Sequence, residues 1–518
     1  MSLFQSKGNR NGVSIFSLSV LAAAVTAFHI LAAPAMAGPM SGTFTIGPGG
    51  DYSSFSAAME DINDRKVGGD IILEIEPGIY NERLYIPWLQ QTNFQTSTSR
   101  LTLRSSTGNA GDVILKSSGL VVSMHINARN VTFENFTVET TSIGTPMFEI
   151  DGWYHIISDM TFIGGHLSGA NYSVSLLIEN CTFLRSSISF LGQQLAGVFI
   201  IGNTFYNGRI GMNRVGTYAI SENVIYSQGT GIQIQDARAP SRIFNNYVYV
   251  ESGSTREALF LHTVDSVLVY HNTLKSLSPG SAFRVAGEAN IHLKNNILFT
   301  TTGHVMDLEF LESVTSDFNG FYTSRDVVAR SGLWREWELY ETYGDFIAAT
   351  GQDANSIFRD PRFDFEAVDS LARMMPGTTA FERAGMNLLE VVPEDLMGNP
   401  RPAAPSLGAI EYLGTETSAP GSDQDGFAVL PVEFALSGNY PNPFNPSTTI
   451  RYDLHESTQV TLTVFDVYGR RVATLASGSM EAGTHSAVFD ASGLASGVYL
   501  YRLSSPAQSL TGKMVLTK

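Results

Sequence analysis

The chain has 518 residues, of which 43% are hydrophobic and only 16% are charged. That apolar content excludes a mainly disordered protein and suffices for a large core. With 32 Lys and Arg against 49 Asp and Glu, the net charge of −17 excludes a nucleic-acid binder held by phosphate contacts. The single cysteine, Cys181, excludes an intrachain disulfide and a zinc site built from cysteines.

Residues 1–37 have the pattern of a signal peptide. Lys7 and Arg10 precede the apolar run 13–33, and Ala35-Met36-Ala37 then supplies a cleavage pattern of small residues. A transmembrane anchor is the alternative, because the apolar run is about long enough to span a bilayer. The cleavage pattern favours export, so we expect a mature chain that has no transmembrane anchor.

Residues 53–67 read as one amphipathic helix, whose apolar face carries Phe55, Ala58, Met59 and Ile62. A solenoid has open ends that must be covered. We therefore expect this helix to be a cap over the first coil of the repeat that follows.

Asparagine marks that repeat. An Asn or Asp recurs about every 23 residues, at Asn135, Asp159, Asn180, Asn203, Asn223, Asn246, Asn272, Asn296 and Asn319. This period is too short for paired-helix repeats, and each unit consists of short alternating strands and turns. The pattern predicts an all-β parallel β-helix over residues 38–319, with coils about 4.8 Å apart and a ladder of Asn side chains that bond from coil to coil.

Three stretches of the front part carry a family resemblance: Gly50-Asp51-Tyr52, residues 75–82 and residues 128–135. Over roughly residues 44–140 the chain is similar to the right-handed β-helix proteins of the pectin lyase-like superfamily, and most of all to pectin methylesterases. The resemblance implies a right-handed parallel β-helix. Where methylesterases carry two catalytic Asp motifs, this chain has residues 164–167 and 187–190, which contain no Asp. No catalytic residue is therefore carried over.

Residues 320–414 are expected to close the β-helix. Four segments resemble ones that are common in secreted bacterial β-helix proteins: residues 351–356, 360–363, 395–401 and 407–411. Residues 415–431 are rich in Ser, Gly, Pro and Asp, so they predict a linker.

The C-terminal part, residues 432–518, alternates short strands with turns, which predicts a small immunoglobulin-like β-sandwich. Its motifs are residues 439–450, Tyr468-Gly469-Arg470 and residues 496–501. Together they resemble the type A sorting domain of the type IX secretion system. The resemblance implies the type IX secretion machinery as a partner and a secreted or outer-membrane cell-surface location. A purely structural immunoglobulin-like module is the alternative.

Ligand chemistry is expected on the outer face of one strand column. Inward apolar pairs such as Ile232/Ile234 turn the residues between and after each pair outward. Aligning these pairs from coil to coil predicts a candidate catalytic set consisting of His262, Arg284, Asp307 and Glu309. In this set Arg would hold a uronate carboxylate while His or Arg takes part in proton abstraction.

The same alignment predicts a substrate-binding set suited to sugar hydroxyls and ring faces: Asn213, Gln233, Gln235, Asp236 and Phe260. It also predicts a metal set for a divalent cation such as calcium: His125, Glu149, Asp151 and His166. Ordinary solvated surface residues would give the same outward pattern.

Three functions remain open at this point. The chain is a surface protein that binds polysaccharide, or a polysaccharide lyase or hydrolase acting on uronate-rich glycans, or a non-catalytic adhesive or structural solenoid. The absence of the family's catalytic motifs favours a non-catalytic function. The net charge of −17 disfavours a polyanionic substrate unless cations bridge it.

Overall fold

The computed structural model describes the following residues: 38–88, 98–190, 194–237, 239–251, 255–325, 327–332, 336–363, 376, 379–411, 435–440, 444–454, 457–466, 470–480, 483–505 and 509–516. The predicted signal peptide and linker lie outside them.

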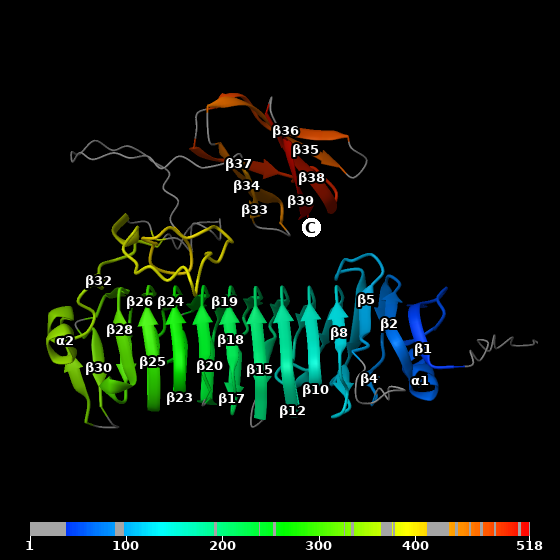
Figure 1. The fold of residues 1–518 in the computed structure, drawn as a ribbon, viewed down its shortest axis with the longest axis horizontal. Helices are drawn as coiled ribbons and strands as arrows, with labels where there is room; N and C mark the ends of the chain where they lie inside the picture. Colours follow the sequence, from blue (N-terminus) through cyan, green and yellow to red (C-terminus); the bar gives the residue numbers. More distant parts are fainter. Residues whose placement is uncertain are drawn as a thin grey trace, which may run out of the picture. The chain divides into compact units, whose positions relative to one another are not determined.

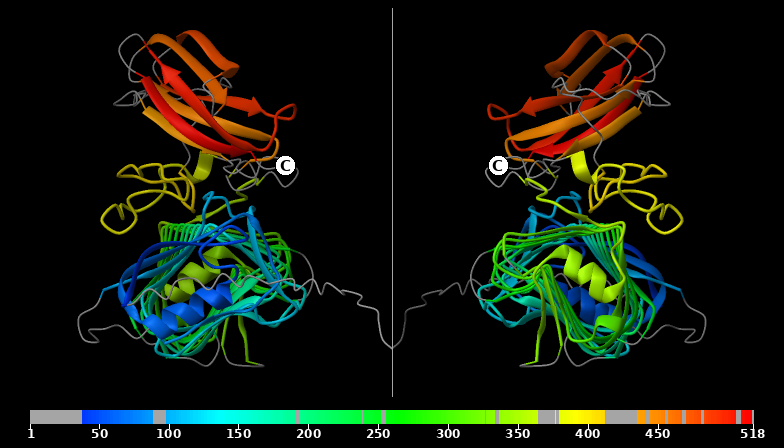
Figure 2. Two further views of the ribbon diagram at one scale, coloured as in Figure 1. Left: turned by 90° about the vertical axis from the view of Figure 1, so that its right-hand side faces the viewer. Right: turned by 90° about the vertical axis from the view of Figure 1, so that its left-hand side faces the viewer.

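The solenoid is built from a 20-stranded sheet and a 12-stranded sheet, here called the large sheet and the small sheet. A typical coil contributes two strands to the large sheet and one to the small sheet, as β17 (Ile210–Asn213), β18 (Tyr218–Ser221) and β19 (Val224–Ser227) do. The arrows lie side by side in Figure 1, and the view along the stack in Figure 2 shows the coils superposed. The predicted stacked coils are confirmed.

The remaining strands of the large sheet are β1 Met40–Ile46, β2 Val67–Ile75, β4 Leu84–Ile86, β5 Leu101–Ser105, β7 Val122–Met124, β8 Val131–Glu134, β10 Pro146–Ser158, β12 His166–Glu179, β14 Ser187–Phe190, β15 Gln194–Ile201, β20 Ile232–Ala237, β21 Ser241–Phe244, β23 Leu259–Tyr270, β25 Phe283–Lys294, β27 Met306–Leu308, β28 Val314–Asp317, β30 Ala329–Ser331 and β31 Glu338–Tyr340. Those of the small sheet are β3 Gly78–Tyr80, β6 Val113–Ser117, β9 Thr137–Thr140, β11 Thr161–Ile163, β13 Thr182–Leu184, β16 Thr204–Tyr206, β22 Tyr247–Val250, β24 Thr273–Ser276, β26 Ile297–Thr300, β29 Gly320–Thr323 and β32 Ile357–Phe358.

Apolar side chains from both sheets fill the interior of the coils. Phe162, Phe183 and Phe205 occupy the same position in three successive coils, and their ring centroids are 5.0 and 4.3 Å apart. All three are fully buried. Because every coil adds the same apolar positions to one continuous core, coil stacking is the main source of stability.

Helices lie at both ends of the stack (Figure 1). The helix α1 (Phe55–Arg65) begins after Ser54, whose hydroxyl caps the backbone N–H of Ala57. Its buried residues are the predicted ones, Phe55, Ala58, Met59 and Ile62. At the far end, β30 pairs antiparallel with β31, and α2 (Tyr343–Thr350) follows. The capping role predicted for the first helix is confirmed.

The Asn ladder is shorter than predicted. Six buried Asn side chains form it, at Asn203, Asn223, Asn246, Asn272, Asn296 and Asn319. Asn135, Asp159 and Asn180 instead have positive φ at the corner itself, one position before the inward residue. The inward residue in those coils is apolar or Cys, at Phe136, Met160 and Cys181. In these three coils the predicted ladder position was one residue too early. Asn is common both at a left-handed corner and in the ladder, so the sequence pattern does not distinguish the two positions.

Residues 379–411 do not close an end of the solenoid but pack on the outer side of the small sheet. Arg401 donates to Asn245 Oδ1 at 2.8 Å and forms a fully buried ion pair with Glu411 at 2.9 Å. Ala409 and Ile410 pack on Tyr247. Lys275, in the small sheet, has no solvent exposure, and its Nζ lies 3.8 Å from the centroid of the Phe363 ring.

The described residues of the C-terminal domain form seven antiparallel strands in two sheets. One sheet contains β33 Ala435–Tyr440, β34 Ser447–Leu454 and β37 Gly483–Asp490. The other contains β36 Arg471–Met480, β35 Thr458–Asp466, β38 Gly497–Ser504 and β39 Ser509–Leu516. The two sheets share one apolar core, which includes Tyr452, Leu462 and Tyr501.

Candidate functional site

An outward row of side chains runs along the last coils of the large sheet. The register places these residues side by side in successive coils, and we call them the outer row: Gln233, Phe260, Arg284, Asp307 and Arg330. The flanking residues in each strand point inward; Leu259 and Leu261 beside Phe260, for example, are fully buried. The predicted alignment of this row from β17 to β27 is confirmed.

Asp307 joins the two arginines of the outer row. Its Oδ2 lies 2.6 Å from Arg330 Nη2 and 3.8 Å from Arg284 Nε. Arg284 Nη1 also lies 3.3 Å from Oε1 of Glu257, whose other oxygen accepts from Thr230 Oγ1 at 3.0 Å. The carboxylates of Asp307 and Glu257 are 3% and 10% exposed, whereas Arg284 and Arg330 are 37% and 30% exposed. The network therefore offers N–H donors to solvent more than carboxylate oxygens.

Two aromatic rings lie against these guanidinium groups. Arg284 Cζ is 5.0 Å from the centroid of Phe260, and Arg330 Cζ is 4.2 Å from that of Trp337. Cation–π contact and the ion pairs with Asp307 together limit the orientations of both guanidiniums. The sequence-predicted site lacked Glu257, Arg330 and Trp337. Extending the alignment one coil beyond Asp307 would have found Arg330, because β30 pairs with β27.

The next outward position of the same strands carries further residues of the predicted sets. Asn213 pairs with Gln235 and Gln235 with His262 in the register, while Asp236 is exposed. Glu309 Oε2 accepts the backbone N–H of Gly287 at 2.6 Å. Of the predicted catalytic set, the structure thus brings Arg284 and Asp307 into an ion pair, and it ties Glu309 to the backbone.

A histidine outside the predicted sets flanks the network. His304 Nδ1 lies 3.2 Å from the carbonyl oxygen of Val327. Burial lowers the pKa of His304, and the positive charge of Arg330 lowers it further, although the Val327 carbonyl opposes the shift. His304 is therefore a neutral imidazole at neutral pH.

The four residues of the predicted metal set have separate surroundings. Asp151 is only 7% exposed, although strand alternation predicted that it points outward. His125 Nδ1 accepts the backbone N–H of Asn127 at 3.0 Å, and its ring stacks on Trp88. His166 pairs with Ser187, which lies two residues before the partner that the predicted alignment gave to His166. Among the described residues, no three His, Cys, Asp or Glu side chains gather in a way that could hold a metal ion.

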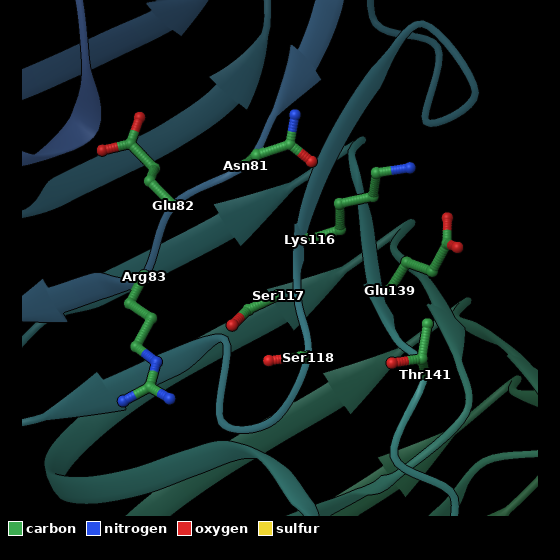
Figure 3. Close-up of a pocket in the computed structure, with 8 residues that line it drawn as sticks. All are labelled: Asn81, Glu82, Arg83, Lys116, Ser117, Ser118, Glu139 and Thr141. Carbon is green, nitrogen blue, oxygen red and sulfur yellow. The ribbon is translucent and has the colours of Figure 1, made fainter.

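A hollow of ≈ 560 Å³ lies at the first coils, at the opposite end of the solenoid from the outer row. Its lining comes from the turn between β3 and β4 and from the ends of β6 and β9: Asn81, Glu82, Arg83, Lys116, Ser117, Ser118, Glu139 and Thr141. Figure 3 shows Arg83 on one side, with the hydroxyls of Ser117 and Ser118 turned toward that side. Lys116, Asn81 and Glu139 lie on the other side (Figure 3).

Residues 439–517 match the family model of the secretion system C-terminal sorting domain. The chain carries a type IX secretion sorting domain. The protein is thus a β-solenoid that the type IX machinery exports, and it is secreted or attached to the outer-membrane surface. No curated protein and no solved structure matches the chain. In the part of the chain that the structure describes, neither helix combines the length and apolar character needed to cross a membrane.

Proposed function

We propose that the exported solenoid binds polysaccharide along the outer row. The observation that carries this proposal is the pairing of partly exposed guanidinium groups with ring faces, Arg284 on Phe260 and Arg330 on Trp337. Sugar hydroxyls accept hydrogen bonds from guanidinium N–H groups, and the apolar faces of sugar rings pack on aromatic rings. Gln233, beside Phe260 in the register, adds an amide that both donates and accepts.

The repeat of the solenoid suits a polymeric ligand. Successive residues of the outer row are one strand spacing apart, so its five positions span about 19 Å. Donors and rings at regular intervals can contact successive units of an extended glycan. A small molecule would use only one or two of these positions.

Binding is better supported than catalysis. A general acid or base must reach a substrate proton directly or through one water. Asp307 and Glu257 are nearly buried and paired with guanidiniums, and Glu309 accepts a backbone N–H. If the protein were a lyase, its proton transfer would have to rely on His262 and Arg284.

We also infer two finer features of the fold. The solenoid winds to the right and belongs with the pectin lyase-like superfamily, a reading supported by its three-strand coils and by the right-handedness of nearly all parallel β crossovers. The sorting domain is an immunoglobulin-like sandwich, a reading supported by its seven antiparallel strands in two sheets around one core.

The proposal is tested by measuring the binding of the mature protein to a panel of plant and algal polysaccharides, with and without calcium. Product release from each polymer is followed in the same samples. Arg284→Ala removes a charge-assisted donor worth about 1.5–3 kcal/mol. We therefore expect at least about tenfold weaker binding of the polymer that the wild type selects.

Two further variants separate binding from folding. Phe260→Ala removes a ring face and leaves the ion pairs in place, so it should also weaken binding. Arg242→Ala removes an exposed arginine from the neighbouring strand β21 and should bind as the wild type does. If Arg284→Ala and Phe260→Ala both bind like Arg242→Ala, the outer row is not the binding surface and the adhesive solenoid becomes the better account. Product release that Arg284→Ala abolishes would favour the lyase or hydrolase.

A further inference from the structure

The hollow at the first coils holds two cations that have no charged partner. Among the described residues, neither Arg83 nor Lys116 forms an ion pair. Lys116 lies directly beside Glu139 in the register of β6 and β9, yet no ion pair joins them. The lining also carries the carboxylates of Glu82 and Glu139, so the feature that distinguishes this hollow is two cationic side chains whose N–H donors are not engaged in an ion pair and can meet an oxyanion.

Glu82 lines the same hollow but forms no ion pair with Arg83 or Lys116 among the described residues. Its Oε1 accepts the backbone N–H of Phe55, and its Oε2 accepts the N–H and the hydroxyl of Ser56, at 3.1–3.2 Å. These donors belong to the first turn of α1, whose N-terminus favours a carboxylate. Glu82 keeps its negative charge, but both of its oxygens are held by the first turn of α1, so they do not occupy the N–H groups of Arg83.

The rest of the lining is entirely hydrophilic. Hydroxyls from Ser117, Ser118 and Thr141, together with the Asn81 amide and the Glu139 carboxylate, complete it without one apolar side chain. Most pockets for small molecules are lined largely by apolar groups. A lining in which every side chain carries a donor, an acceptor or a charge instead suits a ligand with many hydroxyl groups.

We propose that this hollow binds an anionic sugar unit of a polysaccharide, with its oxyanion on Arg83 and the hydroxyls of Ser117 and Ser118. A guanidinium and two hydroxyls are donors for a carboxylate or a sulfate ester. Lys116, Asn81 and Glu139, on the other side in Figure 3, contact the sugar hydroxyls. The site is separate from the outer row, which lies in the last coils, so the inference does not rest on the function proposed above.

Binding is measured with the full mature chain and three kinds of soluble oligosaccharide: sulfated, uronate-containing and neutral. Arg83→Gln removes the charge at one exposed side chain, so its melting temperature should equal that of the wild type. We expect it to bind the anionic oligosaccharide at least roughly tenfold more weakly. Lys116→Gln should weaken the same binding by a smaller factor, and Ser117→Ala provides an uncharged test of the oxyanion contact.

The control is Arg242→Gln, which removes one exposed arginine elsewhere and changes the net charge equally. Preference for the sulfated or the uronate oligosaccharide identifies the oxyanion. If Arg83→Gln and Arg242→Gln bind the anionic oligosaccharides equally, or if the wild type binds the neutral ones as tightly, the inference is overturned. A loss of binding in Arg83→Gln that Arg284→Ala does not share assigns the anionic oligosaccharide to this hollow, whereas a loss in Arg284→Ala alone assigns it to the outer row and overturns the inference.

Discussion

The side-chain nitrogen of Asn223 donates to Oδ1 of Asn246 at 2.9 Å, and the backbone N–H of Asn223 donates to the same oxygen at 3.2 Å. The nitrogen also lies 2.8 Å from the carbonyl oxygens of Ile200 and Ser221. One buried amide thus satisfies backbone groups of its own coil and of the coil before it, and it bonds to the next Asn. Coil-to-coil cohesion at this corner depends on that amide.

Asn223→Leu should therefore destabilise the solenoid. Leucine leaves the buried carbonyls of Ile200 and Ser221 without this donor, and we expect a loss of about 1–3 kcal/mol. Glu222→Asn is the matched control, because Asn tolerates the positive φ of the neighbouring corner and should change stability by less than about 0.5 kcal/mol. Urea denaturation of both variants checks the prediction, and equal losses would contradict the ladder register.

The repeat and its outward row could be predicted from the sequence because local rules determine them. Strand alternation correctly separated the outward Phe260 and Arg284 from their buried neighbours. The same rule failed at His166, where the shift follows from irregular pairing between β10 and β12. A side chain that alternation turns outward can still be buried by its neighbours, as Asp307 is beneath Arg284 and Arg330.

Contacts between distant segments could not be predicted in this way. Nothing in the sequence around Arg401 indicates that it will bond to Asn245, more than 150 residues earlier. The burial of Lys275 likewise depends on rings from Phe363 and Tyr247, which lie in separate segments. Such contacts arise only when the complete fold brings the segments together.

The buried carboxyl of Asp353 makes stability depend on pH. Burial raises its pKa from the ordinary 3.8 to about 6, although hydrogen bonds from Ser356 and Ser316 oppose the shift. The folded state then holds the proton more tightly than the unfolded state does. The contribution of this protonated carboxyl to the free energy of unfolding is fully present below about pH 3.8 and is lost as pH rises through about 6. Its upper limit is about 3 kcal/mol.

Asp353→Asn cannot ionise, so it should abolish this loss of stability between about pH 4 and 6. Thermal melting across that range checks the expectation. Glu341→Gln, at an exposed position, serves as the control and should follow the wild-type pH profile. A difference between Asp353→Asn and the wild type that stays the same at every pH would show that Asp353 is not the titrating group.

The ion pair of Arg401 and Glu411 should be essential for the docking of residues 379–411. Both side chains are nearly fully buried, and Glu411 Oε1 also accepts from the N–H and the hydroxyl of Ser406, both at 2.7 Å. Arg401→Met leaves the Glu411 carboxylate buried without its partner, which typically costs about 3–5 kcal/mol. We expect faster limited proteolysis within the segment and a lower free energy of unfolding.

A second change tests whether the cost comes from the unpaired charge. Arg401→Met combined with Glu411→Gln removes both charges, so it should recover part of the stability that Arg401→Met alone loses. Denaturant titration of the single and double variants measures the coupling. Exactly additive losses would mean that the two side chains act independently, contrary to the buried contact of 2.9 Å.

Passage from the periplasm to the cell exterior should depend on the sorting domain. Residues 439–517 match the secretion system sorting family, and the seven strands of this domain form a core of their own. Deleting residues 432–518 should therefore leave a folded solenoid in the periplasm of a host that uses type IX secretion. Cell fractionation and immunoblotting locate the protein, and circular dichroism of the truncated chain checks that its β structure persists.

As the matched control, residues 415–518 are fused behind an unrelated periplasmic reporter, which should then reach the cell exterior. Normal appearance of the truncated solenoid outside the cell would show that its export signal lies elsewhere in the chain.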